Sequence, residues 1–282
     1  MMAGIALGPL RISRGAPLDA VAGSVFAAFS YRLMSSVYSG PCIRVRRSTD
    51  NALRDFGFFA SWLDVVALLD WVRAQSLTAS GFVVTWYDQS GRGRHITQTT
   101  ASAQRRIVNA GVLESFGGQP ALAGGAGQYY ASAWPVLPQP ATIIATLKLP
   151  DYTVGQDQNL IRTNALATGY NGVPYIINSG GRVALYAGVG LIGATLVDNT
   201  AYALSWVMAG TASLVGANGV YTTGDVGAEA INAAPNVFAG LGGAAPVIGQ
   251  CGDLVVFNAA LTQAQITSIS RTLAAPRGIV VP

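Results

Sequence analysis

The segment FVVTWYDQSGRGRHITQ, residues 82–98, carries the clearest fold signal in the chain. Its first half is rich in β-branched and aromatic side chains, which is typical of a buried or half-buried strand. The next residues, Asp88 to Ser90, can hydrogen-bond nearby backbone groups, and Gly91 and Gly93 permit a positive φ angle. The segment therefore predicts a strand, a tight turn and a second extended stretch.

Two interpretations of this turn follow from its polar residues. In the first, Asp88 and Gln89 hydrogen-bond a sugar at the rim of a β-sandwich while Trp86 or Tyr87 stacks on it. In the second, the Asp-Gln-Ser-Gly run satisfies its own backbone, and this structural interpretation is the favoured one. His95 has no second histidine to pair with in the sequence, so we expect a packed or solvated turn residue.

Composition indicates one large β-domain that buries part of its surface against other subunits. Only 11% of the 282 residues are charged, 51% are hydrophobic and 34 are glycine, so charges are too few to cover an ordinary soluble surface. The 17 basic residues include a single lysine, Lys148. Arg44, Arg46 and Arg47 alternate through an apolar strand, so nucleic acid is not an expected partner.

The chain ends and the two cysteines give further expectations. Residues 1–18 are rich in Gly and Pro and predict an arm that serves as an assembly contact, followed by a single domain over 19–282. The amino terminus lacks a secretion-signal pattern, and the uncharged stretches are interrupted too often to insert into a membrane. Cys42 and Cys251 are too few for a metal site; they could be bonded, but free thiols are favoured. No cofactor is expected.

Hydrophobic periodicity predicts an antiparallel sandwich with one or two short helices. A short helix or turn is expected over 18–34, before the first strand, and a helix over about 62–75. A last helix follows Thr262, which resembles an N-cap. An alternating strand is expected over 141–149, and Asn218-Gly219 is a type I′ turn signal. Other strands are expected within residues 39–58, 82–98, 105–111, 117–133, 175–188, 202–224 and 253–258.

Three motifs together resemble a known family. They are SGPCIRVRRSTDNALRDFGF (39–58), WYDQSGRGRHITQ (86–98) and GDLVVFNAALTQAQI (252–266). They are similar to the catalytic domain of fungal arabinofuranosidase B proteins and to the laminin-G-like, or concanavalin-like, domains found in bacterial and bacteriophage virion proteins. The resemblance covers roughly residues 27–275. It implies an all-β, two-sheet antiparallel jelly-roll sandwich.

The residues needed for the enzymatic activity of that family do not match. The resemblance implies a retaining glycosidase, which needs two carboxyl groups about 5–5.5 Å apart. The family nucleophile lies in a Glu-Asn-Gly context, yet neither Glu114 nor Glu229 is followed by Asn-Gly. The acid/base would follow a Gly-x-Gly-Gly stretch, where this chain has Ala244 after residues 240–243. A paired-cysteine motif is also missing. No catalytic residue is therefore assigned, and Asp225 and Glu229 are the least poor candidates.

These observations predict a structural protein of a bacteriophage or phage-like particle, such as a spike, fibre, tail tip or decoration. Its expected partners are itself and other virion subunits, with host surface polysaccharide as a candidate ligand. Its expected location is the virion, assembled in the bacterial cytoplasm. The alternative is an α-L-arabinofuranosidase-like glycoside hydrolase. Most aromatic residues of the candidate glycan site are also candidate core residues. The site comprises Trp86, Tyr87, Asp88, Gln89, Arg92, Tyr129, Tyr130 and Trp134.

Overall fold

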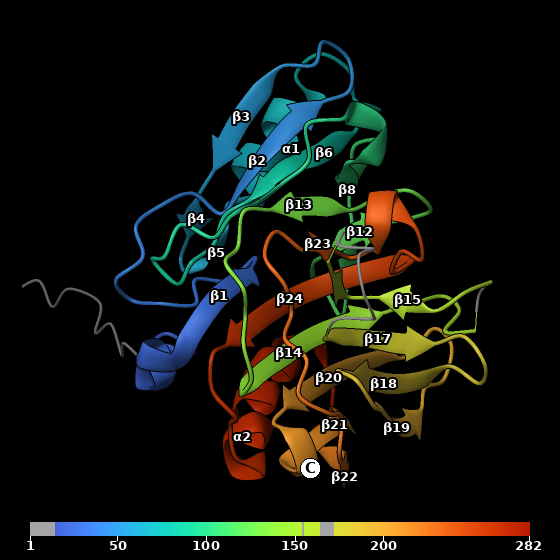
Figure 1. The fold of residues 1–282 in the computed structure, drawn as a ribbon. Coiled ribbons are helices and arrows are strands. Elements are labelled where there is room, and N and C mark those ends of the chain that lie inside the picture. The colour runs from blue at the N-terminus through green and yellow to red at the C-terminus, as the bar shows by residue number, and fades with distance from the viewer. Residues whose placement is uncertain (1–14, 154, 164–171) are drawn as a thin grey trace, which may run out of the picture.

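A computed structural model describes residues 15–153, 155–163 and 172–282 (Figure 1). The fold is mostly antiparallel β-structure with two short α-helices, which confirms the predicted sandwich class. One large sheet runs through the whole molecule. The strands along its path are, in order, β16 (Ile161–Arg162), β23 (Asn236–Val237), β13 (Tyr130–Ser132), β7 (Ile96–Thr97), β6 (Gly81–Trp86), β8 (Arg105–Asn109), β12 (Leu122–Gly124), β24 (Gly249–Phe257), β14 (Ala141–Lys148), β20 (Ala201–Met208), β21 (Ser213–Ala217) and β22 (Val220–Gly224).

Further strands extend this sheet or form smaller ones. Side branches of the large sheet are β1 (Val25–Ser30) on β24, β2 (Ile43–Arg47) on β6, β3 (Leu53–Phe56) on β2, and β9 (Val112–Leu113) on β8. A four-stranded sheet contains β15 (Gln158–Asn159), β17 (Val173–Ile177), β18 (Arg182–Tyr186) and β19 (Gly190–Thr195). Two short ladders pair β4 (Phe58–Phe59) with β5 (Trp62–Leu63) and β10 (Ser115–Phe116) with β11 (Gln119–Pro120).

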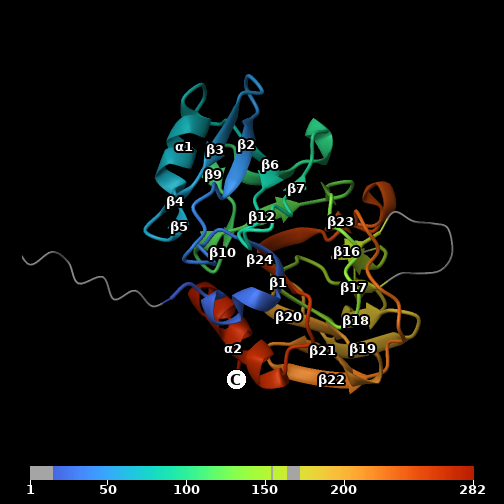
Figure 2. The same ribbon diagram turned by 60° about the vertical axis from the view of Figure 1, so that its left-hand side comes forward.

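The four-stranded sheet packs on one end of the large sheet and makes the sandwich. Strands β18 and β19 contact β20, β21 and β22 of the large sheet. Helix α2 (Gln263–Ala274) covers the opposite face of β14 and β20 (Figure 2). Helix α1 (Val65–Arg73) lies at the other end of the molecule, beside β9. None of the helices in the described ranges has the length and apolarity needed to cross a bilayer.

Strand β14 differs from its prediction because both of its faces are buried. The sequence predicted an alternating strand, yet every residue from Ala141 to Leu147 is buried. Ile143 belongs to the main core between the sheets, while Ile144 points to the other face and packs in the cluster that contains Ile266 and Ile269 of α2. Helix α2 thus makes both faces apolar, and each fully buried Ile stabilises the fold by about 1.5–3 kcal/mol.

Local signals predicted the helices and turns well. Helix α1 is shorter than the predicted 62–75, because Trp62 and Leu63 form β5 and Asp64 caps the helix by accepting from the Ala67 N–H at 3.0 Å. The region 18–34 contains a 3₁₀-helix, Asp19–Ser24, that leads into β1 as expected. The β21–β22 turn has the positive φ angles of a type I′ turn, 49° at Asn218 and 82° at Gly219.

The remaining short elements complete the chain. Other 3₁₀-helices are Ala101–Ala103, Gly210–Ala212, Leu241–Gly243 and Ala275–Arg277. Cys42 and Cys251 are both buried and unbonded, which confirms the expectation of free thiols. Residues 1–14 of the predicted assembly arm lie outside the described residues.

Candidate functional site

The Asp88 carboxylate holds the corner between β6 and β7. Its Oδ1 atom accepts hydrogen bonds from the Ala28 and Ser90 N–H groups, both at 2.9 Å. Its Oδ2 atom accepts from the Ser90 hydroxyl at 2.7 Å and from the Arg94 N–H at 3.0 Å. The residue is only 1% exposed. With four protein donors around it, the carboxylate organises the turn and has no surface to offer a ligand.

Gln89 and His95 belong to the same corner. The Gln89 side chain accepts from the Met34 N–H and donates to the Ser30 carbonyl oxygen, both at 2.8 Å, which ties the turn to β1. The His95 Nδ1 atom accepts from the Asp88 N–H at 3.0 Å, and the imidazole packs edge-on against Tyr87. The favoured structural interpretation of this turn agrees with these contacts.

The structure does not bring the eight predicted glycan-site residues together on one surface. Trp86, Tyr130 and Trp134 are 0–2% exposed, like Asp88 and Gln89. The Tyr130 hydroxyl donates to the Val83 carbonyl oxygen at 2.9 Å, and Trp86 stacks on Phe238. Sequence alone could not distinguish these core aromatics from ligand-stacking ones, because both occur on strands next to polar turns.

The three other members of that set are more accessible but have structural partners or lie apart. Tyr87 is half-buried and its hydroxyl donates to the Asp55 carboxylate at 2.9 Å. Arg92 is exposed, and its Nε donates to the Val25 carbonyl oxygen at 2.8 Å. Tyr129 is half-buried and contacts the glycine loop near Gly243.

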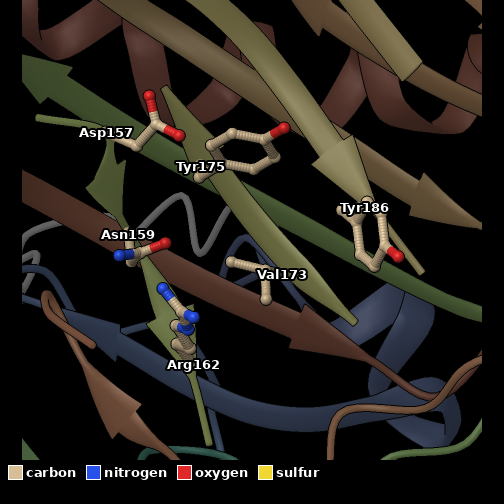
Figure 3. A pocket seen from close by; sticks show the side chains of 6 residues that line it. All are labelled: Asp157, Asn159, Arg162, Val173, Tyr175 and Tyr186. Carbon is tan, nitrogen blue, oxygen red and sulfur yellow. The ribbon is translucent and has the colours of Figure 1, made fainter. Parts of the chain in front are cut away.

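A pocket of about 210 Å³ lies at a different place, in the four-stranded sheet and the adjoining β16. Figure 3 shows two tyrosine rings, an amide and two charged groups around it. Its lining residues are Asp157, Asn159, Arg162, Val173, Tyr175 and Tyr186.

Strand pairing explains why these residues meet. Asn159 of β15 pairs with Tyr175 of β17, and Val173 pairs with Tyr186 of β18. Asp157 lies just before β15, where its carboxylate accepts from the Asn178 N–H at 3.0 Å and holds the β17–β18 turn. Alternate residues of one strand share a face, so Val173 and Tyr175 both line the pocket.

The Tyr175 hydroxyl is a neutral donor and acceptor at physiological pH. Burial raises its pKa above the usual value, and the nearby Asp157 carboxylate and the Tyr186 ring hydroxyl act in the same direction. Each of these causes disfavours the phenolate. The described lining of the pocket therefore combines two tyrosine side chains with one amide, one carboxylate and one guanidinium.

The loop that the resemblance associates with the acid/base lies next to this pocket. The Asn159 N–H donates to the Ala245 carbonyl oxygen at 2.9 Å, and Asn159 forms a parallel bridge with Pro246. Ala244 is exposed beside them. An alanine side chain cannot transfer a proton, so the position implied for the acid/base carries no acid.

The least poor catalytic candidates of the sequence, Asp225 and Glu229, do not line the pocket. Asp225 is exposed and its carboxylate accepts from the Gly227 N–H at 2.8 Å. The Glu229 N–H donates to the Ala187 carbonyl oxygen at 2.9 Å, one residue beyond the pocket-lining Tyr186. Within the described ranges, no three His, Cys, Asp or Glu side chains gather into a metal site.

Comparison with solved structures finds the same fold in arabinofuranosidases. A GH54 α-L-arabinofuranosidase soaked with a cyclic sulfate inhibitor superposes with a TM-score of 0.69 over 93% of this chain, at 15% sequence identity. A mutant GH54 enzyme soaked with 4-nitrophenyl α-L-arabinofuranoside gives 0.68 over 93% at 14% identity. An arabinofuranosidase complexed with arabinofuranosyl-α-1,2-xylobiose gives 0.67 over 95% at 15% identity.

The protein has the arabinofuranosidase β-sandwich fold. It spans 65–66% of the length of these arabinofuranosidase chains. No protein-family model and no curated protein matches the sequence. At such low identity the likeness is one of fold, which supports the fold part of the predicted resemblance.

Sequence reasoning missed the pocket, although a weak signal was present. The run QDQNLIR, residues 156–162, places Asp157 and Asn159 at the alternate spacing that puts two side chains on one face of an extended strand. Nothing local indicates that this run pairs with β17 or lies against residues 245 and 246.

Proposed function

We propose that the protein binds carbohydrate in the pocket lined by Asp157, Asn159, Arg162, Tyr175 and Tyr186. The observation that carries the proposal is the placement of two tyrosine rings beside planar and charged polar groups in one concavity (Figure 3). Aromatic rings pack on the apolar faces of sugar rings, and fixed amide, carboxylate and guanidinium groups orient the hydroxyls.

The size of the pocket suits one sugar ring. Its volume of about 210 Å³ is below the roughly 300–1,000 Å³ of pockets that enclose drug-sized ligands. A pocket of this size favours a monosaccharide or the end of a chain over a long oligosaccharide. The GH54-like fold supports the proposal as a scaffold on which sugar-processing proteins are built.

The test compares this pocket with the site expected from sequence. A glycan array identifies ligands, and their affinities are then measured by NMR titration for two variants. Tyr175→Ala should weaken binding at least tenfold because it removes a ring of the pocket, whereas Tyr87→Ala should leave the affinity unchanged. The reverse pattern would move the site to the β6–β7 corner, and the absence of any ligand on the array would refute carbohydrate binding.

Glycoside hydrolysis is a second candidate, favoured by the fold shared with the arabinofuranosidases. A retaining mechanism needs two carboxyl groups about 5–5.5 Å apart, and Asp157 is the one carboxylate among the described lining residues. We therefore expect no turnover of 4-nitrophenyl α-L-arabinofuranoside. Turnover that Asp157→Asn abolishes, with the fold intact, would establish the enzyme and displace the binding-only proposal.

Assembly into a bacteriophage or phage-like particle remains a separate proposal. It rests on the low charge of the chain and on large apolar side chains at the surface, such as Val37, Phe59 and Val66, which are 89%, 74% and 71% exposed. The proposal predicts self-association in light scattering and presence of the protein in purified particles. A dispersed monomer at high concentration, absent from particles, would contradict it.

A further inference from the structure

Two side chains of opposite charge lie at opposite ends of the pocket. Figure 3 shows Asp157 at one end, beside the ring of Tyr175, and Arg162 at the other, with Asn159 between them and Val173 to the side. The two ends of the pocket therefore differ in chemistry. The Asp157 carboxylate supplies hydrogen-bond acceptors at one end, and the planar Arg162 guanidinium supplies donors at the other.

Building on the proposed carbohydrate site, we infer that the bound sugar carries a carboxylate, as a hexuronic acid does. Its carboxylate lies against Arg162, and its hydroxyls donate to Asp157. A guanidinium matches a carboxylate through two parallel N–H···O bonds, which a neutral sugar hydroxymethyl group cannot reproduce. The Asp157 end accepts sugar O–H groups, because an ionised carboxylate has acceptor sites only.

The arrangement of neighbouring groups supports this orientation. Asn159 is 2% exposed, and its backbone N–H is held by the Ala245 carbonyl oxygen at 2.9 Å, so the strand that leads to Arg162 is fixed. Asp157 is fixed at the other end by the Asn178 N–H. A carboxylate placed at the Asp157 end would meet a like charge, which disfavours the reversed orientation.

The net charge of the whole chain also favours an anionic ligand. The formal net charge is +4, and a positive protein attracts anionic ligands at low ionic strength. An acidic polysaccharide would thus be drawn to the molecule before its terminal residue enters the pocket.

The test uses matched pairs of sugars that differ in one group. Methyl glucuronide and methyl galacturonide are titrated against methyl glucoside and methyl galactoside by NMR, with the full chain at low salt. Each uronide should bind at least tenfold more tightly than its neutral partner, since a hydrogen bond to a charged group contributes about 1.5–3 kcal/mol and each 1.4 kcal/mol is tenfold. Arg162→Gln should abolish that preference, so that each uronide binds no more tightly than its neutral partner does to the same variant.

Two variants keep the test selective. Arg182→Gln changes an exposed arginine on β18, outside the pocket, and should preserve the preference. Arg162→Lys keeps the positive charge but removes the two parallel N–H donors of the guanidinium, so it should lose most of the preference for uronides. It replaces Arg162→Gln in the test if that variant does not fold. Thermal melting checks the fold of each variant.

The outcomes separate this inference from the proposed function. Equal affinities within each pair, or a preference that survives both Arg162 variants, would overturn the inference that Arg162 binds a sugar carboxylate. Carbohydrate binding itself would still stand. Methyl glucoside 6-sulfate binding as tightly as the glucuronide would show recognition of charge alone and would also overturn it. If neither uronides nor neutral glycosides bind, both proposals fail.

Discussion

Two aspartates, Asp88 and Asp157, show that the same side chain can hold a turn at one position and line a pocket at another. Asp88 and Asp157 both accept backbone hydrogen bonds at a turn. Asp88 is enclosed by four donors, whereas Asp157 faces a concavity with Arg162 and Tyr175. The residue type is identical, and its surroundings decide its role.

At the residue scale, Asp88→Asn should destabilise the protein without changing its affinity for sugar. The change replaces a charged acceptor by a neutral one and introduces an amide donor among backbone N–H groups, so a loss of about 1–3 kcal/mol in the free energy of unfolding is expected. Urea unfolding measures it. Asp225→Asn, at an exposed carboxylate, is the matched control with an effect near zero. Lost sugar binding at unchanged stability would contradict the structural role.

Among the elements, helix α2 shows how a local signal and a long-range contact combine. The Thr262 hydroxyl accepts from the Gln265 N–H at 3.3 Å, and the Gln265 side chain accepts from the Thr262 N–H at 2.9 Å, which completes a capping box. The sequence pattern predicts this cap. The apolar side of the helix then packs on β14, which makes that strand buried on both faces.

Thr262→Ala should lower the free energy of unfolding by about 1 kcal/mol, because it leaves the Gln265 N–H without its side-chain acceptor. Thermal or urea unfolding gives the value, and helix α2 is far enough from the pocket that ligand affinity should not change. Gln263→Ala, at the neighbouring exposed position, provides the control with little effect. A loss no greater than that of the control would mean that the cap does not hold the helix.

Across the whole molecule, a buried ion pair fastens the carboxyl-terminal segment to the large sheet. Arg277 donates from Nε to the Asp253 carboxylate at 3.2 Å and from Nη2 to the Pro120 carbonyl oxygen at 2.9 Å. The same carboxylate accepts from the hydroxyls of Ser30 and Thr146, both at 2.6 Å. The Asp253 carboxylate of β24 thus joins side chains from β1, β14 and the carboxyl-terminal segment.

Arg277→Met should cost about 3–5 kcal/mol of unfolding free energy, because it leaves the Asp253 carboxylate buried without its counter-charge. The double variant Arg277→Met/Asp253→Leu should be less destabilised than the sum of the single variants. A double-mutant cycle by chemical unfolding measures this coupling. Additive effects would show that the two side chains stabilise the protein independently.

Patterns along the chain predicted the β-sandwich class, the corner at residues 82–98, both helices and the type I′ turn at Asn218-Gly219. Each of these depends on residues close together in the chain, where side-chain periodicity, caps and positive φ angles act locally. Long-range packing, in contrast, sets which aromatic side chains are buried in the core and where a pocket forms. The pocket needs residues 157–162 beside residues 173–186 and 245–246, and such pairings follow from packing across the whole sheet rather than from local preference.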